Sequence, residues 1–300
     1  MKMTIMLLMT AMLLMTAMLA GCSDEDASST DAYSGEQPFT LVVSEVPWDG
    51  QTVSLTRSGE TLASLQQTSN PVGANEGFGL FCTSLSLNNQ QVTWDATTLR
   101  WDLGNMLIWP KPKPTDFFAY APYYIGTTLN EGKMAFNCPI NNTTDLLWAE
   151  ASQNQNEVDL QFHHALAKLS FGTITNGHLD NITLNSIVVK DRTAQRLYES
   201  GNLSLATGEW TDLTPWSTEQ TISYTDFDPD NVGDQTLTVN SGATENMNVR
   251  DILQIPGPTV EITVTYNTTK TITFTTTLEQ GKNKTLNLTI GKNHEVVIGE

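Results

Sequence analysis

The most regular pattern of hydrophobic and polar positions lies near the carboxyl end of the chain. There, hydrophobic residues alternate with threonine, glutamate and asparagine in three segments separated by short turns, namely Val260–Tyr266, Ile272–Leu278 and Leu286–Ile290. Because successive side chains of a strand point to opposite faces of a sheet, each segment has one face to bury and one face for water. The pattern predicts an antiparallel meander of three strands, packed on one side and solvated on the other.

The first half of the chain has shorter segments of the same kind. Composition and length predict a strand over Phe39–Val46, in which Phe39, Leu41 and Val43 share one face. The residues Pro47–Gly50 then turn the chain. We expect this strand to contribute apolar side chains to a core through that face.

Two later segments indicate how the first half is packed. Gly77–Cys82 is predicted as a strand whose glycines indicate a close backbone approach or a bulge. Aromatic residues lie on both faces of Asp116–Tyr124, which indicates burial on both sides or a contact surface. The segment Phe162–Phe171 fits strand and helix spacing equally, so periodicity alone leaves it open. Segments of period two with turn signals and no long helical pattern predict an all-β sandwich fold.

The amino-terminal residues follow a different pattern. Lys2 precedes 18 uncharged residues, Met3–Ala20, and a membrane-spanning helix needs about 20 apolar residues. The run is typical of a secretory signal peptide that ends in a small-residue cleavage site. The tetrad Leu19-Ala20-Gly21-Cys22 resembles the bacterial lipobox, in which the cysteine thiol is acylated and the chain is cut before it. The resemblance implies a signal peptide over residues 1–21 and lipidation of Cys22, which anchors the chain in a membrane.

Residues 22–38 are acidic, rich in small polar residues and poor in apolar ones, so we expect a solvated tether. The run Ser23–Asp26 also resembles the export tag of surface-displayed lipoproteins in Bacteroidetes. The whole chain has 15 Lys and Arg residues against 33 Asp and Glu residues, for a formal net charge of -18. This charge repels phosphate backbones and argues against nucleic acid as a partner.

Known catalytic and metal-binding patterns are absent from the sequence, including the zincin, nucleophile-elbow and phosphate-loop motifs. His163 and His164 are adjacent, so on a strand they point to opposite faces and cannot share a metal. With the isolated His178 and His294, they are interpreted as polar surface or half-buried histidines. We expect no enzyme activity, no metal and no cofactor.

Two further features of the sequence resemble binding or redox sites. The segment Asp226–Asp234 spaces carboxylates as a calcium loop does, but the EF-hand pattern fails at Asn231 and Leu237, which favours a solvated acidic turn. Cys82 and Cys138 would be free to form a disulfide after export. Buried thiols are the favoured interpretation of the two cysteines, and their pairing stays open.

Several segments together, in order along the chain, resemble the fimbrillin family, which comprises the pilins and pilus-accessory lipoproteins of Bacteroidales. They are the lipobox, the Thr56-Arg57 step before the Gly-Phe-Gly-Leu-Phe strand, the aromatic strand Asp116–Tyr123, the mid-chain Val158–Lys168, the hairpin Tyr198–Trp210 and the turn Leu253–Pro258. The resemblance covers nearly the whole chain after the signal peptide. It implies two tandem transthyretin-like Greek-key β-sandwich domains, over residues 39–162 and 163–300, and an extended Phe162–Phe171 that crosses between them.

The resemblance also implies a mode of assembly. Precursors of this family are lipoproteins of the outer membrane, and an Arg-specific protease removes their amino-terminal segment together with the first strand. The groove that remains accepts a strand from another fimbrillin subunit. On this basis Arg57, the first basic residue after the signal peptide, is the candidate cleavage site. Phe39, Leu41 and Val43 mark the exchangeable strand of a surface-exposed pilus subunit that contributes to cell adhesion.

Two alternatives stand beside this interpretation. Members that act as anchors keep their first strand, so Phe39–Val46 would be a permanent edge strand and Arg57 an uncut loop residue. The chain would otherwise be a non-polymerising lipoprotein that binds glycans, host proteins or bacterial surface ligands through aromatic residues such as Trp94, Trp101 and Tyr123. Core packing is the favoured interpretation of the tryptophans.

Overall fold

The computed structural model describes residues 40–48, 77–95, 97–98, 100–104, 114–154, 156–225, 227, 236–293 and 296–299. All of them belong to one compact unit, Glu36–Glu300. Regular structure in these residues consists of strands, apart from short 3-10 turns such as Thr83–Leu85 (η2). Among the described residues, no helix has the length and apolar character needed to cross a membrane. The expected all-β class is therefore confirmed.

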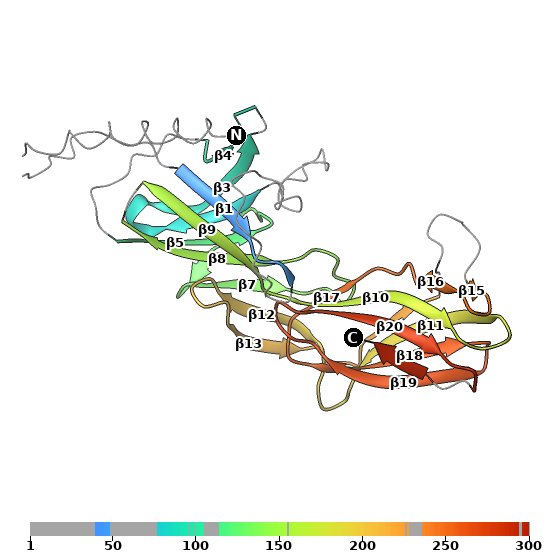
Figure 1. The fold of residues 1–300 in the computed structure, drawn as a ribbon. Helices are drawn as coiled ribbons and strands as arrows, with labels where there is room; N and C mark the ends of the chain where they lie inside the picture. The colour runs from blue at the N-terminus through green and yellow to red at the C-terminus, as the bar shows by residue number, and fades with distance from the viewer. Residues whose placement is uncertain are drawn as a thin grey trace, which may run out of the picture. The chain divides into compact units, whose positions relative to one another are not determined.

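The largest sheet has seven strands in the order β1-β9-β8-β5-β2-β3-β4. Their bounds are β1 Thr40–Glu45, β9 Glu157–His164, β8 Leu147–Gln153, β5 Thr115–Ala121, β2 Phe78–Cys82, β3 Leu87–Asp95 and β4 Arg100–Asp102. Figure 1 shows β1 in blue beside β9 at one edge. The pair β1–β9 is parallel, and the other ladders of this sheet are antiparallel.

A second, four-stranded sheet has the order β13-β12-β7-β6. Its strands are β6 Leu129–Asn130, β7 Lys133–Asn137, β12 Tyr198–Ser204 and β13 Trp210–Pro215. A buried cluster joins this sheet to the seven-stranded one and includes Phe81, Tyr120, Met134 and Leu203. The sheet draws strands from both sides of residue 162, and the predicted domain boundary at that residue stays a prediction.

Two five-stranded sheets enclose the largest core. One contains β10 Ala167–Asn176, β16 Thr244–Asn246, β17 Ile252–Gln254, β20 Asn283–Ile290 and β21 Val296–Gly299; the other contains β11 Ile182–Asp191, β14 Thr221–Tyr224, β15 Leu237–Val239, β18 Thr259–Tyr266 and β19 Lys270–Thr277. Buried residues of both sheets form one hydrophobic cluster, including Phe171, Ile187, Ile262 and Leu286. This is the layered β architecture that the alternation predicts, whereas its Greek-key, transthyretin-like connectivity stays a prediction.

The predicted meander is correct in its first hairpin and wrong in its third strand. Strands β18 and β19 pair over all eight residues, and Val260, Ile262 and Val264 are buried as expected. Strand β20 does not pair with β19; it pairs in parallel with β10 and antiparallel with β21, in the other sheet. The chain crosses between the sheets at the buried Leu278. Alternation identifies the face that is buried but not the strand alongside, so it could not distinguish these arrangements.

The segment Phe162–Phe171 is extended, as the family resemblance implies. Strand β9 ends at His164 and β10 begins at Ala167, so the chain passes from the seven-stranded sheet to a five-stranded one within two residues. The backbone between them is fixed by two hydrogen bonds at 2.8 Å, from the Ala165 amide to the Leu146 carbonyl and from the Trp210 indole to the Ala165 carbonyl. The parallel register of β1 and β9 places the ends of these two strands side by side, just before this crossing.

Candidate functional site

The first strand lies at the edge of the seven-stranded sheet and contributes to its core. Leu41 is 8% exposed and belongs to the hydrophobic cluster that contains Val158, Leu160 and Phe162 of β9. Val43 is half-buried and packs against the same cluster. Leu41 and Val43 thus share an inward face, as predicted, while Phe39 lies outside the described residues.

The backbone of β1 is held along one side. In its register with β9, Thr40 lies opposite Glu157 and Glu45 lies opposite Phe162. Hydrogen bonds at the two ends run from the Thr40 amide to the Asn156 carbonyl, at 2.8 Å, and from the Val46 amide to the Phe162 carbonyl, at 2.7 Å. Among the described strands, β9 is the only ladder partner of β1. Loss of β1 would therefore open a single edge, that of β9.

The other face of β1 includes a buried polar group that the described residues leave without a hydrogen-bond partner. Ser44 is buried, and its hydroxyl has no hydrogen-bond partner among the described residues. A buried hydroxyl without a partner costs about 1–3 kcal/mol. This cost lowers the stability of β1 in its position at the sheet edge.

Side chains gather where β1 ends. The His164 imidazole, 3% exposed, lies 2.5 Å from the Asp145 carboxylate through Nδ1 and 3.5 Å from the Glu45 carboxylate through Nε2. Trp48 stacks on its ring, with 3.8 Å between centroids and 14° between planes. The Lys168 ammonium lies 5.8 Å from the Trp48 ring and 2.8 Å from the Asp251 carboxylate. We call Glu45, Trp48, Asp145, His164 and Lys168 the His164 cluster; it borders a cleft of about 560 Å³.

His164 corrects one sequence interpretation. It is buried rather than on the surface or half-buried. The reason is its position in β9, because Val158, Leu160, Phe162 and His164 alternate on the buried face. That alternation could have predicted the burial of His164 from the sequence. The contacts of His164 with Trp48 and Asp145, which lie 116 and 19 residues away along the chain, could not be predicted from a local pattern.

Among the remaining candidate residues, packing accounts for Trp94 and Trp101. Trp101 is buried and packs edge-on against Phe78, at 5.1 Å, and Trp94, at 5.4 Å, so core packing of Trp94 and Trp101 is confirmed. Tyr123 is half-buried.

Cys82 and Cys138 are buried free thiols, the favoured interpretation, and burial raises the pKa of Cys138 to about 12. No cluster of three or more metal-ligating side chains occurs among the residues that the structure describes. Cys22, Arg57 and most of Asp226–Asp234 lie outside those residues.

Comparison with known proteins places the chain in a family. The sequence matches the family described as fimbrillin-like over residues 66–300. This chain belongs to the fimbrillin-like family. Comparison with curated protein sequences gives no match.

Two solved structures share the fold of this fimbrillin-like chain. A fimbrial protein from Bacteroides vulgatus superposes with a TM-score of 0.57 at 18% identity, over 87% of this chain and 97% of that one. A "putative cell adhesion protein" from Bacteroides ovatus superposes with a TM-score of 0.53 at 18% identity, over 89% of this chain and 97% of that one. At this identity the likeness concerns the fold.

Proposed function

We propose that this fimbrillin-like protein is a surface lipoprotein that serves as a structural or accessory subunit of a pilus and contributes to cell adhesion. Cleavage at Arg57 would release the first strand, and a strand of another subunit would take its place. The observation that carries this proposal is the position of β1, an edge strand that fills part of a core and has β9 as its only described ladder partner. Family membership favours such a structural role over an enzymatic one.

Removal of β1 would create a strong acceptor site. Val158, Leu160 and Phe162, which are fully buried, would lose the cover of Leu41 and Val43. Fully burying a side chain of this size is worth about 1.5–3 kcal/mol. The edge of β9 would also present unpaired backbone groups, and an extended segment binds such an edge by adding a strand to the sheet.

The geometry of the β1–β9 pair would favour an incoming strand. The pair is parallel, and parallel pairing is slightly less stable per residue than antiparallel pairing. A donor strand that enters antiparallel to β9 would gain from this difference. The Ser44 hydroxyl, which has no partner among the described residues, adds to the disadvantage of the resident strand.

The order of features along the chain suits a cut before exchange. Arg57 follows β1, so cleavage there leaves the strand held only by its contacts. The fimbrillin-like match, residues 66–300, lies entirely on the carboxyl side of Arg57. The released segment would stay on its lipid at Cys22 while the remaining chain assembles, and its departure makes the exchange effectively irreversible.

Limited proteolysis tests this function. The full precursor, purified without lipid, is treated with a low dose of trypsin and analysed without boiling. We expect a fragment that begins at Ser58 and slowly migrating oligomers from the wild type, and neither from Arg57→Ala. Equal oligomer formation by Arg57→Ala, or a wild type that is cut and stays monomeric, would contradict the proposal.

Lipidation of Cys22 is tested separately in cells. Metabolic labelling with an alkynyl fatty acid should label the wild type, and Cys22→Ala should lose the label because the acylated thiol is gone. Equal label on both proteins would contradict lipidation at Cys22.

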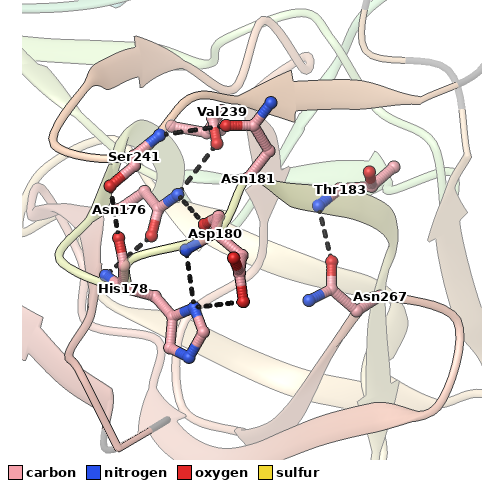
Figure 2. A network of polar contacts seen from close by, with 8 residues as sticks. All are labelled: Asn176, His178, Asp180, Asn181, Thr183, Val239, Ser241 and Asn267. Atoms are coloured by element: carbon pink, nitrogen blue, oxygen red, sulfur yellow. Dashed lines mark hydrogen bonds and ion pairs between the residues drawn. The ribbon is translucent and has the colours of Figure 1, made fainter.

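A second function, ligand binding by a non-polymerising surface lipoprotein, is favoured by one observation. Leu179 is 79% exposed in the turn between β10 and β11, and side-chain and backbone hydrogen bonds fix this turn (Figure 2). A rigid turn that presents a large apolar side chain is suited to protein contact, because little entropy is lost on binding. A stable monomer after trypsin cleavage would favour this function.

A further inference from the structure

Beyond the ladder, β1 is retained by a separate set of side-chain contacts. The last backbone hydrogen bond to β9 comes from Val46, and Pro47 has no amide proton with which to continue the ladder. The chain nevertheless stays on the protein, because Trp48 stacks on His164 at 3.8 Å. Glu45 makes the second contact with His164, at 3.5 Å.

The other half of the His164 cluster is fixed independently of β1. Asp145 holds Nδ1 of His164 at 2.5 Å, and Lys168, which faces Trp48, is held by Asp251 at 2.8 Å. The imidazole is therefore oriented before Trp48 and Glu45 reach it. Contacts to a group that is already positioned lose less conformational entropy than contacts between mobile side chains.

We propose that the His164 cluster retains the first strand and sets the rate at which β1 is released. This inference rests on the exchange of β1 proposed above and adds its regulation. Trp48 lies between β1 and Arg57, so a cut at Arg57 leaves both Trp48 and Glu45 on the departing segment. Release then requires breaking the Trp48–His164 stack as well as the ladder, which keeps the groove filled between cleavage and the arrival of a donor strand. Trp48, His164 and Glu45 are thus positioning residues for exchange.

Hydrogen exchange of the intact, full chain tests the inference without cleavage. Deuterium uptake is measured by mass spectrometry in the peptide that covers residues 40–48, for wild type, Trp48→Ala, His164→Gln and the double variant. Each single variant should exchange about five- to tenfold faster in this peptide, as expected for the loss of one aromatic contact. The double variant should be no faster than the faster single variant, because both changes remove the same contact.

His163→Gln is the matched control. His163 neighbours His164 on β9, but its ring stacks on Trp148, at 5.1 Å, and is not in the His164 cluster. Exchange in the peptide of residues 40–48 should stay within about twofold of wild type, because adjacent side chains of a strand point to opposite faces and His163 therefore points away from the face that holds His164. Trp48→Ala keeps His164 and its contact with Asp145. This variant therefore tests the inference even if His164→Gln does not fold. Unchanged exchange in Trp48→Ala, or full additivity in the double variant, would overturn the inference.

A second measurement separates this inference from the proposed function. After trypsin cleavage of the full chain, the amino-terminal fragment is followed by gel filtration over time. The fragment should dissociate slowly from the wild type. It should dissociate faster from Trp48→Ala, by the same factor as the increase in hydrogen exchange. Faster release without any oligomers would support retention by the cluster and contradict the pilus function. Oligomers with equal release from both proteins would support the function and contradict retention.

Discussion

At the scale of single residues, two adjacent histidines show how strand geometry assigns different roles. His164 points to the buried face of β9, where Asp145, Glu45 and Trp48 surround it. His163 points to the opposite face and stacks on Trp148 at 5.1 Å. Burial and the neighbouring His164 lower the pKa of His163, and Glu150 opposes them. His163 is therefore half-buried, in line with the sequence interpretation of a surface or half-buried histidine, whereas His164 is buried.

The lowered pKa of His163 predicts a pH dependence of stability. The unfolded chain binds a proton at this histidine near pH 6.5, and the folded protein binds it only at lower pH. The unfolded state therefore carries more protons between these two pKa values, and stability falls as the pH drops below about 6.5. Urea unfolding from pH 7.5 to pH 5 should show a shallower loss of stability in His163→Gln than in wild type. Identical slopes for the two proteins would contradict this assignment.

Sequence reasoning reached some residue environments and not others. It correctly placed Leu41 and Val43 on one face of the first strand, the tryptophans Trp94 and Trp101 in a core and the cysteines as buried thiols, because burial follows from residue type and alternation. It missed Trp48 as a contact of β9. That contact depends on the fold bringing together residues far apart in the chain, which local pattern does not encode.

At the scale of elements, the turn between β10 and β11 shows how one side chain organises a connection (Figure 2). The buried Asn176 amide donates to the Asp180 and Val239 carbonyls, both at 2.9 Å. Its oxygen accepts from the His178 amide at 2.8 Å. Ser241 from the neighbouring turn donates to the His178 carbonyl at 2.7 Å. These bonds connect two turns into one fixed surface around the exposed Leu179.

Removing this side chain should destabilise the protein. In Asn176→Ala the Asp180 and Val239 carbonyls and the His178 amide lose this partner. Of these residues only Val239 is buried, and a buried polar group left without a partner costs about 1–3 kcal/mol. Asn181→Ala is the control, because exposed Asn181 accepts only the Ser241 amide in this network, at 3.2 Å. Urea unfolding should show a clear loss of stability for Asn176→Ala and at most a small one for Asn181→Ala. Equal effects would contradict the central role of Asn176.

The elements also show which features of the fold the alternation of hydrophobic and polar residues predicts and which it does not. It predicted the hairpin of β18 and β19. The extended crossing after β9 came from the family resemblance, because strand and helix spacing fitted that segment equally. The glycines of Gly77–Cys82 indicate a close backbone approach or a bulge, and a Cβ on Gly77 would lie 1.8 Å from the Val92 backbone carbonyl oxygen. The partner of β20 was mispredicted, because neighbours in a sheet are decided by the chain crossing at Leu278 rather than by any pattern within the strand.

At the scale of the whole molecule, family membership and the edge position of β1 support one account. The fimbrillin-like chain has a layered β structure in which β1, at the edge beside β9, contributes Leu41 to the core. In the proposed exchange, β1 is removable after cleavage, and its removal is necessary for assembly. Phe39 and Arg57 lie outside the described residues, so the removable strand is tested through Thr40–Glu45 itself.

A reversible disulfide between β1 and β9 is the most direct test of this central claim. Val42 and Asp159 are register partners, on the face away from Leu41 and Val43, and paired Cα atoms on adjacent strands lie within the span that a disulfide bridges. The full-length double variant Val42→Cys and Asp159→Cys is cut with trypsin while oxidised and then reduced. We predict a monomer while the disulfide holds β1 in place and oligomers after reduction, with wild type forming oligomers under both conditions. Oligomers from the oxidised variant would contradict the exchange of β1.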